Sequence, residues 1–241
     1  MTDIRIDEIA DGVYRLATYL PDMDFGFNQF LVDAEEPLLF HTGQRALFPV
    51  VTELIGRVMP VERLRWITFG HVEADECGAM NSFLAAAPNA TVAHGAIACM
   101  VQVSDLADRE PRPLGDGEII DLGSKRVRNI DTPHLPHGWD AHVLFEETTR
   151  TLFCGDLFTR FGETEPVTSD DIVEVALQGE EFGGPTALTP STGPRIRAMA
   201  DLQPQTLALM HGPAFNGDCT KALIGLGDGY DAMLRDAEAS V

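Results

Sequence analysis

Residues 71–78 (His-Val-Glu-Ala-Asp-Glu-Cys-Gly) decide the fold and the chemistry of this sequence. They follow residues 65–69 (Arg-Trp-Ile-Thr-Phe), an apolar run that predicts a buried strand, and a helix is expected to begin where they end. At about 100° per residue, a helix would direct Glu73 away from His71 and Asp75. An extended loop directs all three side chains to one side. We therefore predict an extended loop at the carboxyl end of a strand, aimed at one small volume.

Three later segments bring the same residue types to the ends of apolar strands. His137 lies within residues 131–140, Asp156 ends residues 152–156, and His211 ends residues 207–211. Imidazole nitrogens and carboxylate oxygens are suitable ligands for zinc, iron and manganese. The sequence therefore predicts a metal site whose candidate ligands are His71, Glu73, Asp75, His137, Asp156 and His211.

The rest of the chain predicts two β-sheet halves with helices outside. Short β-prone runs begin at Gly12, and helical spacing occurs in residues 46–58, 96–103, 194–202 and 219–237. Residues 159–190 are rich in Gly, Pro, Thr and acidic residues, which predicts a long loop that covers the site or shapes a pocket. We expect residues 1–241 to form a single domain.

The order of these motifs resembles the metallo-β-lactamase superfamily across nearly the whole chain. The order is H-x-E-x-D, then His, then Gly-Asp, then His-Gly, and residues 41–43 (His-Thr-Gly) stand where the superfamily has D-T-G. More narrowly, H-x-E-x-D-E-C-G resembles the free-standing oxygen-binding di-iron proteins. These are relatives of the di-iron domain of flavodiiron oxygen and nitric oxide reductases. The resemblance implies an α/β fold (α+β), the αβ/βα four-layer sandwich.

The resemblance also implies a ligand set for two metal ions. One ion is expected on His71, Glu73 and His137, the other on Asp75 and His211, with Asp156 as the bridge. His137 is favoured over His134 because its spacing to Asp140 resembles the H-x-x-D stretch of flavodiiron proteins.

Two glutamates distinguish this chain from hydrolases of the superfamily. Glu73 and Glu76 stand where those enzymes typically have histidine. Hard oxygen donors favour two iron ions over zinc, with zinc or manganese as alternatives. Whether Glu76 binds the second metal stays open.

Other conspicuous side chains receive structural interpretations. We expect the histidines outside the ligand set to be structural or to contact ligands: His41, His94 and His142. The aromatic residues of the first strands either line a pocket beside the metals or pack a core: Tyr19, Phe25, Phe27 and Phe30. The cysteines are scattered without a C-x-x-C pair, which predicts reduced and mostly buried thiols: Cys77, Cys99, Cys154 and Cys219.

Composition restricts the partners. The formal charge of −21 disfavours nucleic acid and anionic membranes as partners. No long apolar run or signal-peptide pattern is present, so we expect a cytoplasmic protein. A homodimer is also considered.

Two functions fit the predicted site. The first is binding or reduction of dioxygen, with NO and peroxide as related ligands, either as an O2 sensor or carrier or as a reductase. The chain shows no flavodoxin-like or rubredoxin-like segment, so a reductase would take electrons from an external partner. The second is hydrolysis, in which a metal-bound hydroxide attacks a carbonyl or phosphoryl group. Glu73 and Glu76 favour the di-iron hypothesis.

Overall fold

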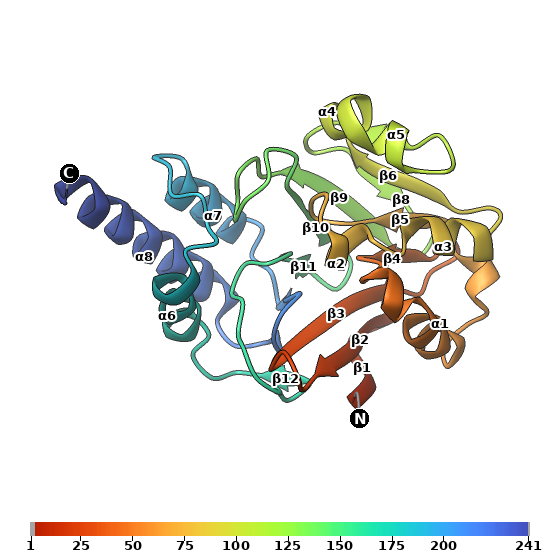
Figure 1. The fold of residues 1–241 in the computed structure, drawn as a ribbon, viewed down its shortest axis with the longest axis horizontal. Coiled ribbons are helices and arrows are strands. Elements are labelled where there is room, and N and C mark those ends of the chain that lie inside the picture. The colour runs from red at the N-terminus through yellow and green to blue at the C-terminus, as the bar shows by residue number, and fades with distance from the viewer. Residues whose placement is uncertain (1–2, 241) are drawn as a thin grey trace.

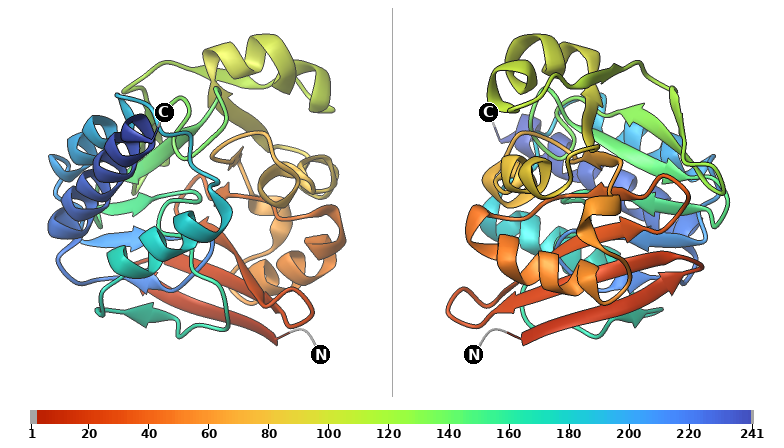
Figure 2. Two further views of the ribbon diagram at one scale, coloured as in Figure 1. Left: turned by 60° about the vertical axis from the view of Figure 1, so that its left-hand side comes forward. Right: turned by 90° about the vertical axis from the view of Figure 1, so that its right-hand side faces the viewer.

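Two facing β-sheets with helices on both outer sides build the chain (Figure 1). The structure is a computed structural model that describes residues 3–240. Met1, Thr2 and Val241, which the single-domain prediction includes, lie outside the described residues. The views in Figure 2 show the helices at the carboxyl end on the side opposite to those of the amino-terminal half.

The first sheet has seven strands in sequence order. The strands β1 to β4 are antiparallel, and β4 to β7 are parallel. The antiparallel start that the sequence predicts is therefore confirmed. The strands are β1 (Asp3–Ala10), β2 (Val13–Leu20), β3 (Phe25–Val32), β4 (Leu38–Phe40), β5 (Trp66–Thr68), β6 (Thr91–Gly95) and β7 (Arg112–Leu114).

The second sheet comes from the other half of the chain and has the order β12-β14-β13-β11-β10-β9-β8. The strands β8 to β11 are antiparallel, whereas β11 pairs with β13 in parallel. The strands are β8 (Ile119–Asp121), β9 (Arg126–Asp131), β10 (His142–Glu146), β11 (Thr151–Phe153), β12 (Val167–Thr168), β13 (Thr206–Ala208) and β14 (Ala214–Phe215).

Mostly short helices accompany the first sheet, and three helices of nine or more residues cover the second. On the first side lie η1 (Arg45–Leu47), α1 (Phe48–Gly56), η2 (Val61–Arg63), α2 (Ala74–Cys77), α3 (Met80–Ala86), α4 (Ala96–Ala98), the π-helical turn η3 (Cys99–Val103) and α5 (Ser104–Leu106). On the second side lie α6 (Val173–Gly183), α7 (Thr192–Ala200) and α8 (Cys219–Ala239). The carboxylate of Asp218 accepts a 2.9 Å hydrogen bond from the backbone N–H of Lys221 and so caps α8.

Alternating side chains along the strands sort the core into three layers. On β3, Phe27 and Leu31 face α1 and α3, whereas Phe30 packs between the sheets. On β10, Val143 faces the carboxyl-terminal helices and Leu144 packs between the sheets. Helix, sheet, sheet and helix layers result, which confirms the predicted four-layer α/β sandwich.

Two expectations about the chain need correction. Residues 159–190 are not one long loop, because β12 and α6 lie within them. The apolar positions Ile172 and Ala176 are buried against the second sheet's helices, which explains the helix. The prediction also missed β1, in which Ile4 and Ile6 alternate with charged residues.

None of the helices within residues 3–240 has the length and the apolar composition needed to cross a bilayer. The four cysteines are free thiols, as predicted, and those other than Cys77 are buried.

Candidate metal centre

The loop after β5 supplies the first two candidate ligands. His71 lies three residues beyond the end of β5, and the backbone bends at Val72, where the N–H of Glu73 donates a 3.0 Å hydrogen bond to the carbonyl oxygen of His71. Glu73 itself is extended, with φ and ψ of −138° and 156°. His71 Nε2 and Glu73 Oε2 are 2.8 Å apart. The two side chains converge as predicted, but through a bend between them and not through an extended loop.

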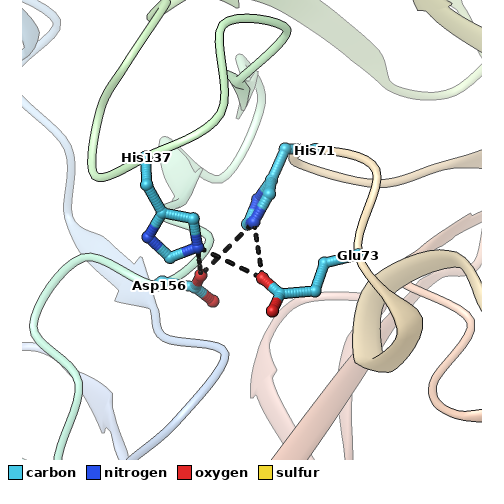
Figure 3. Close-up of side chains that lie close together, drawn as sticks. All are labelled: His71, Glu73, His137 and Asp156. Atoms are coloured by element: carbon cyan, nitrogen blue, oxygen red, sulfur yellow. Dashed lines mark hydrogen bonds and ion pairs between the residues drawn. The ribbon is translucent and has the colours of Figure 1, made fainter. Parts of the chain in front are cut away.

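His137 and Asp156 join this pair from the second sheet. His137 comes from the loop between β9 and β10, and Asp156 lies three residues after β11. His137 Nε2 is 3.1 Å from Glu73 Oε2 and 3.4 Å from Asp156 Oδ2. One donor atom from each of the four residues lies within 4.8 Å of the others, and Figure 3 shows the four side chains pointing toward one another. This spacing suits a single ion held by two imidazoles and two carboxylates.

Asp75 and His211 form a second group on the other side of Asp156. His211 Nε2 is 3.5 Å from Asp75 Oδ2 and 3.4 Å from Asp156 Oδ1. Asp156 therefore presents Oδ2 to His71 and His137, which are 3.8 and 3.4 Å away, and Oδ1 to His211. The six predicted residues lie together in two groups that share one carboxylate.

The extended-loop prediction is wrong for Asp75. The short helix α2 begins at Ala74, so Asp75 lies in its first turn and not on an extended loop. The helical backbone directs its carboxylate to His211, away from the pair of His71 and Glu73. The loop thus serves both groups because its conformation changes after Glu73.

Glu76 lies behind His71 and not between the two groups. Its side chain is fully buried, Oε2 accepts a 2.6 Å hydrogen bond from the backbone N–H of His71, and Oε1 is 3.2 Å from His71 Nδ1. Burial raises the pKa of Glu76 to about 7 although its contacts with His71 oppose this shift. Glu76 can therefore fix the ring of His71 and leave Nε2 free for a metal.

His211 is oriented in a comparable way by β3. Its Nδ1 donates a 2.8 Å hydrogen bond to the carbonyl oxygen of Gly26, which leaves Nε2 facing the carboxylates. The ring of Phe25 stacks on the imidazole at a centroid distance of 4.3 Å, and Phe27 meets it edge-on at 5.3 Å. Two of the aromatic residues of the first strands thus lie beside the site, whereas Phe30 packs on Phe153 in the core.

The remaining histidines lie outside the two groups. His41, His94 and His142 are buried, and burial lowers the pKa of each, that of His142 to about 4. The rings of His94 and His142 stack on each other at a centroid distance of 4.2 Å. His134 is exposed, so His137 is the histidine of its loop that faces the carboxylates.

The carboxylates of the site raise the pKa of two of its histidines. Burial lowers the pKa of His71, but its hydrogen bonds with Glu73 and Glu76 outweigh this effect and raise it to about 11. Burial likewise lowers the pKa of His211, and Asp156 and Asp75 raise it to about 10. The carboxylates thus hold protons on neighbouring imidazoles, and metal ions would compete with these protons for the same donor atoms.

Two carboxylate oxygens support the fit of a metal. Within residues 3–240, Asp75 Oδ1 and Asp156 Oδ1 are buried and make no hydrogen bond, although Asp156 Oδ1 lies 3.4 Å from His211 Nε2. An unpaired buried oxygen carries a desolvation penalty that a bound cation would offset. The donor set of three imidazoles and three carboxylates suits iron, manganese or zinc.

The sequence did not reveal the role of Asp140. Its Oδ2 accepts 2.9 Å hydrogen bonds from the backbone N–H of Val72 and from Gln102 Nε2, so it holds the ligand loop against η3. Only the spacing of Asp140 to His137 pointed to this residue.

Comparison with known proteins identifies the family. Residues 25–182 match the profile described as ODP family beta lactamase. The chain belongs to this family. The ODP match includes the whole of β3, the ligand loop, His137 and Asp156, whereas His211 lies beyond it.

Relatives of this ODP-family chain include larger flavoproteins. Diflavin flavoprotein A 1 of Thermosynechococcus vestitus is 26% identical over 198 residues, covering 78% of this chain and 34% of that protein. The anaerobic nitric oxide reductase flavorubredoxin of Pectobacterium carotovorum is 22% identical over 154 residues, covering 63% and 30%. The chain therefore spans about a third of these relatives.

A solved structure shows the same fold. The rubredoxin oxygen:oxidoreductase of Desulfovibrio gigas superposes with a TM-score of 0.79 at 17% identity, covering 94% of this chain and 62% of that one. The resemblance to flavodiiron proteins that the motifs indicated is confirmed by these relatives.

Proposed function

We propose that this chain is a binuclear non-haem iron protein that binds or reduces dioxygen, with NO and peroxide as related ligands. His71, Glu73 and His137 would hold one ion, Asp75 and His211 the other, and Asp156 would bridge them. The observation that carries the proposal is the position of Asp156, whose two oxygens face different groups of ligands. The names of the relatives, a nitric oxide reductase and an oxygen oxidoreductase, support the same chemistry.

Two ferrous ions would supply the electrons for this chemistry, one from each ion. The protein's own part is to hold the ions close together and to orient their ligands. Glu76 fixes the ring of His71 through Nδ1, and the carbonyl oxygen of Gly26 fixes that of His211. Glu73, at the position of a histidine in hydrolases, adds a hard anionic donor, which favours the ferric state after oxidation.

The site is accessible from the side of Glu73 and His137. Their side chains are 51% and 33% exposed, whereas those of Asp75, Asp156 and His211 are 18% exposed or less. A small ligand would therefore approach past Glu73. Repeated reduction of the ligand would require an external electron donor.

We also propose that residues 1–241 form one domain.

The experiment uses protein loaded anaerobically with ferrous iron and then exposed to O2. We expect oxygen uptake and new near-ultraviolet and visible absorption from ferric iron, neither of which a zinc-loaded sample can produce because zinc is redox-inert. The variant Glu73→His should hold iron less well. Both forms are assayed in parallel for cleavage of lactones, thioesters and phosphodiesters. An iron form that stays unchanged in air, together with a zinc form that turns over an ester, would establish the hydrolase alternative instead.

A further inference from the structure

The helical segment of residues 96–106 exposes an apolar face. Ile97, Met100 and Val101 are 64%, 77% and 58% exposed, and their spacing of i, i+3 and i+4 places them on one side of the helix. The opposite side is apolar as well, because Cys99 and Val103 are buried in the first core layer. A helix that buries one apolar face and exposes a second is typical of an interaction surface. We call Ile97, Met100 and Val101 the 97–101 face.

This face is joined to the rim of the candidate metal centre. Gln102, on the same helical segment, donates a hydrogen bond to Asp140, and Asp140 holds the backbone N–H of Val72. Val72 lies between the candidate ligands His71 and Glu73. Trp139, which precedes Asp140, is also an exposed apolar side chain. A partner on the 97–101 face would therefore lie next to the accessible side of the site.

The surroundings of the face are acidic. Asp105, Asp108 and Glu110 are exposed along the next residues of the chain. Arg109 lies among them and donates to the backbone carbonyl oxygens of Leu84, Ala87 and Ala90, but its single positive charge leaves the carboxylates in excess. With a net charge of −21, the chain would attract a basic protein to this acidic stretch.

We propose that the 97–101 face is the docking surface for a positively charged electron-donor protein. The inference rests on the proposed function, since it assigns the route by which electrons reach the metals. The donor gives up one electron in each encounter and is oxidised, and one ferric ion is reduced to ferrous. Apolar contacts through Met100 would hold the partner, while Asp105, Asp108 and Glu110 would attract it.

The kinetic test uses cytochrome c as a cationic redox probe. Electrons cross a docking surface in either direction, so anaerobic ferrous protein is mixed with ferricytochrome c and the haem absorbance is followed. Each haem iron gains one electron, and one ferrous ion loses one. Met100→Lys should slow the reaction roughly tenfold. Added salt should lower the rate of electron transfer from the unmodified protein, because it screens the attraction between the two proteins. The matched control Ile224→Lys makes the same charge change at a 41% exposed position on α8, at the opposite side of the molecule from α4 and α5 (Figure 1), and should react at nearly the unmodified rate.

A second measurement needs no iron and separates this proposal from the proposed function. Carbodiimide joins carboxylates to lysines in contact, and mass spectrometry locates the products in zinc-loaded protein mixed with cytochrome c. We expect cross-links at Asp105, Asp108 or Glu110, fewer of them with Met100→Lys, and few with cytochrome c whose lysines are acetylated. The proposal fails if the cross-links lie elsewhere, if acetylated cytochrome c reacts as well, or if Ile224→Lys slows transfer as much as Met100→Lys. It also fails if light scattering shows a dimer that Met100→Lys dissociates, since the face would then bind a second copy.

Discussion

Replacement of Asp156 by asparagine tests the shared carboxylate. The amide keeps the size of the side chain and removes its negative charge. Two opposite unit charges 4 Å apart attract each other by about 4 kcal/mol at an effective dielectric constant of 20. Loss of this attraction should lower the affinity of the protein for each ion about a thousandfold. The two groups would suffer unequally, because one keeps His71, Glu73 and His137, whereas the other keeps only Asp75 and His211. We expect Asp156→Asn to retain at most one ion per chain under conditions in which the unmodified protein retains two.

The assay is metal content after equilibrium dialysis at a fixed free concentration of ferrous iron, without oxygen. Asp140→Asn is the matched control, because it makes the same chemical change beside the site. The carboxylate of Asp140 accepts hydrogen bonds from the backbone N–H of Val72 and from Gln102 Nε2, neither of which is a candidate ligand. The control should retain two ions. Two ions bound at unchanged affinity in Asp156→Asn would refute the shared carboxylate.

Three further predictions concern the surroundings of the site. Glu76→Gln should weaken metal binding about 10–100-fold without changing the number of ions, because Glu76 contacts the backbone N–H and Nδ1 of His71 and would act by orienting that ring. Competition with a chelator measures the affinity, and loss of one ion would contradict this role. Phe25→Ala should lower the free energy of unfolding of metal-free protein by about 2 kcal/mol in urea titrations, since a half-buried ring stacked on His211 is lost; no change would exclude that contribution. Burial lowers the pKa of His142 to about 4, so its contribution to stability is complete above pH 6.5 and is lost as the pH falls toward 4. From pH 7 to 5 the unfolding free energy of the unmodified protein should fall by roughly 2 kcal/mol more than that of His142→Phe. Equal losses in the two proteins would show that folding does not lower the pKa of His142.

The sequence predicted the sandwich because its strands carry a strong pattern. The apolar run before His71 and the runs before Asp156 and His211 became β5, β11 and β13, and each ends at the site. The helix α6 was missed because Gly, Pro and Thr dominate the composition of residues 159–190 and conceal a short run of helical spacing between Ile172 and Ala176.

The identity of the candidate ligands was accessible from residue type and order, whereas their geometry was not. Spacing could not reveal that α2 begins at Ala74 and directs Asp75 to His211. Nor could it place Glu76, since a glutamate next to a ligand can face the metal or the back of an imidazole. The outward apolar face at Met100 is likewise invisible to periodicity, because helical spacing does not tell which side of a helix is covered.

The division of the candidate ligands between the two sheets has a consequence for assembly. The amino-terminal half supplies His71, Glu73 and Asp75, and the carboxyl-terminal half supplies the other three, so neither half can complete either group of ligands. Each bound ion would act as a cross-link between segments far apart in the sequence. Because such ions bind only the assembled sandwich, their binding free energy adds to the cohesion of the two halves. Separation of the halves would release both ions in a single event, and the supply of metal would then govern how long the folded chain persists.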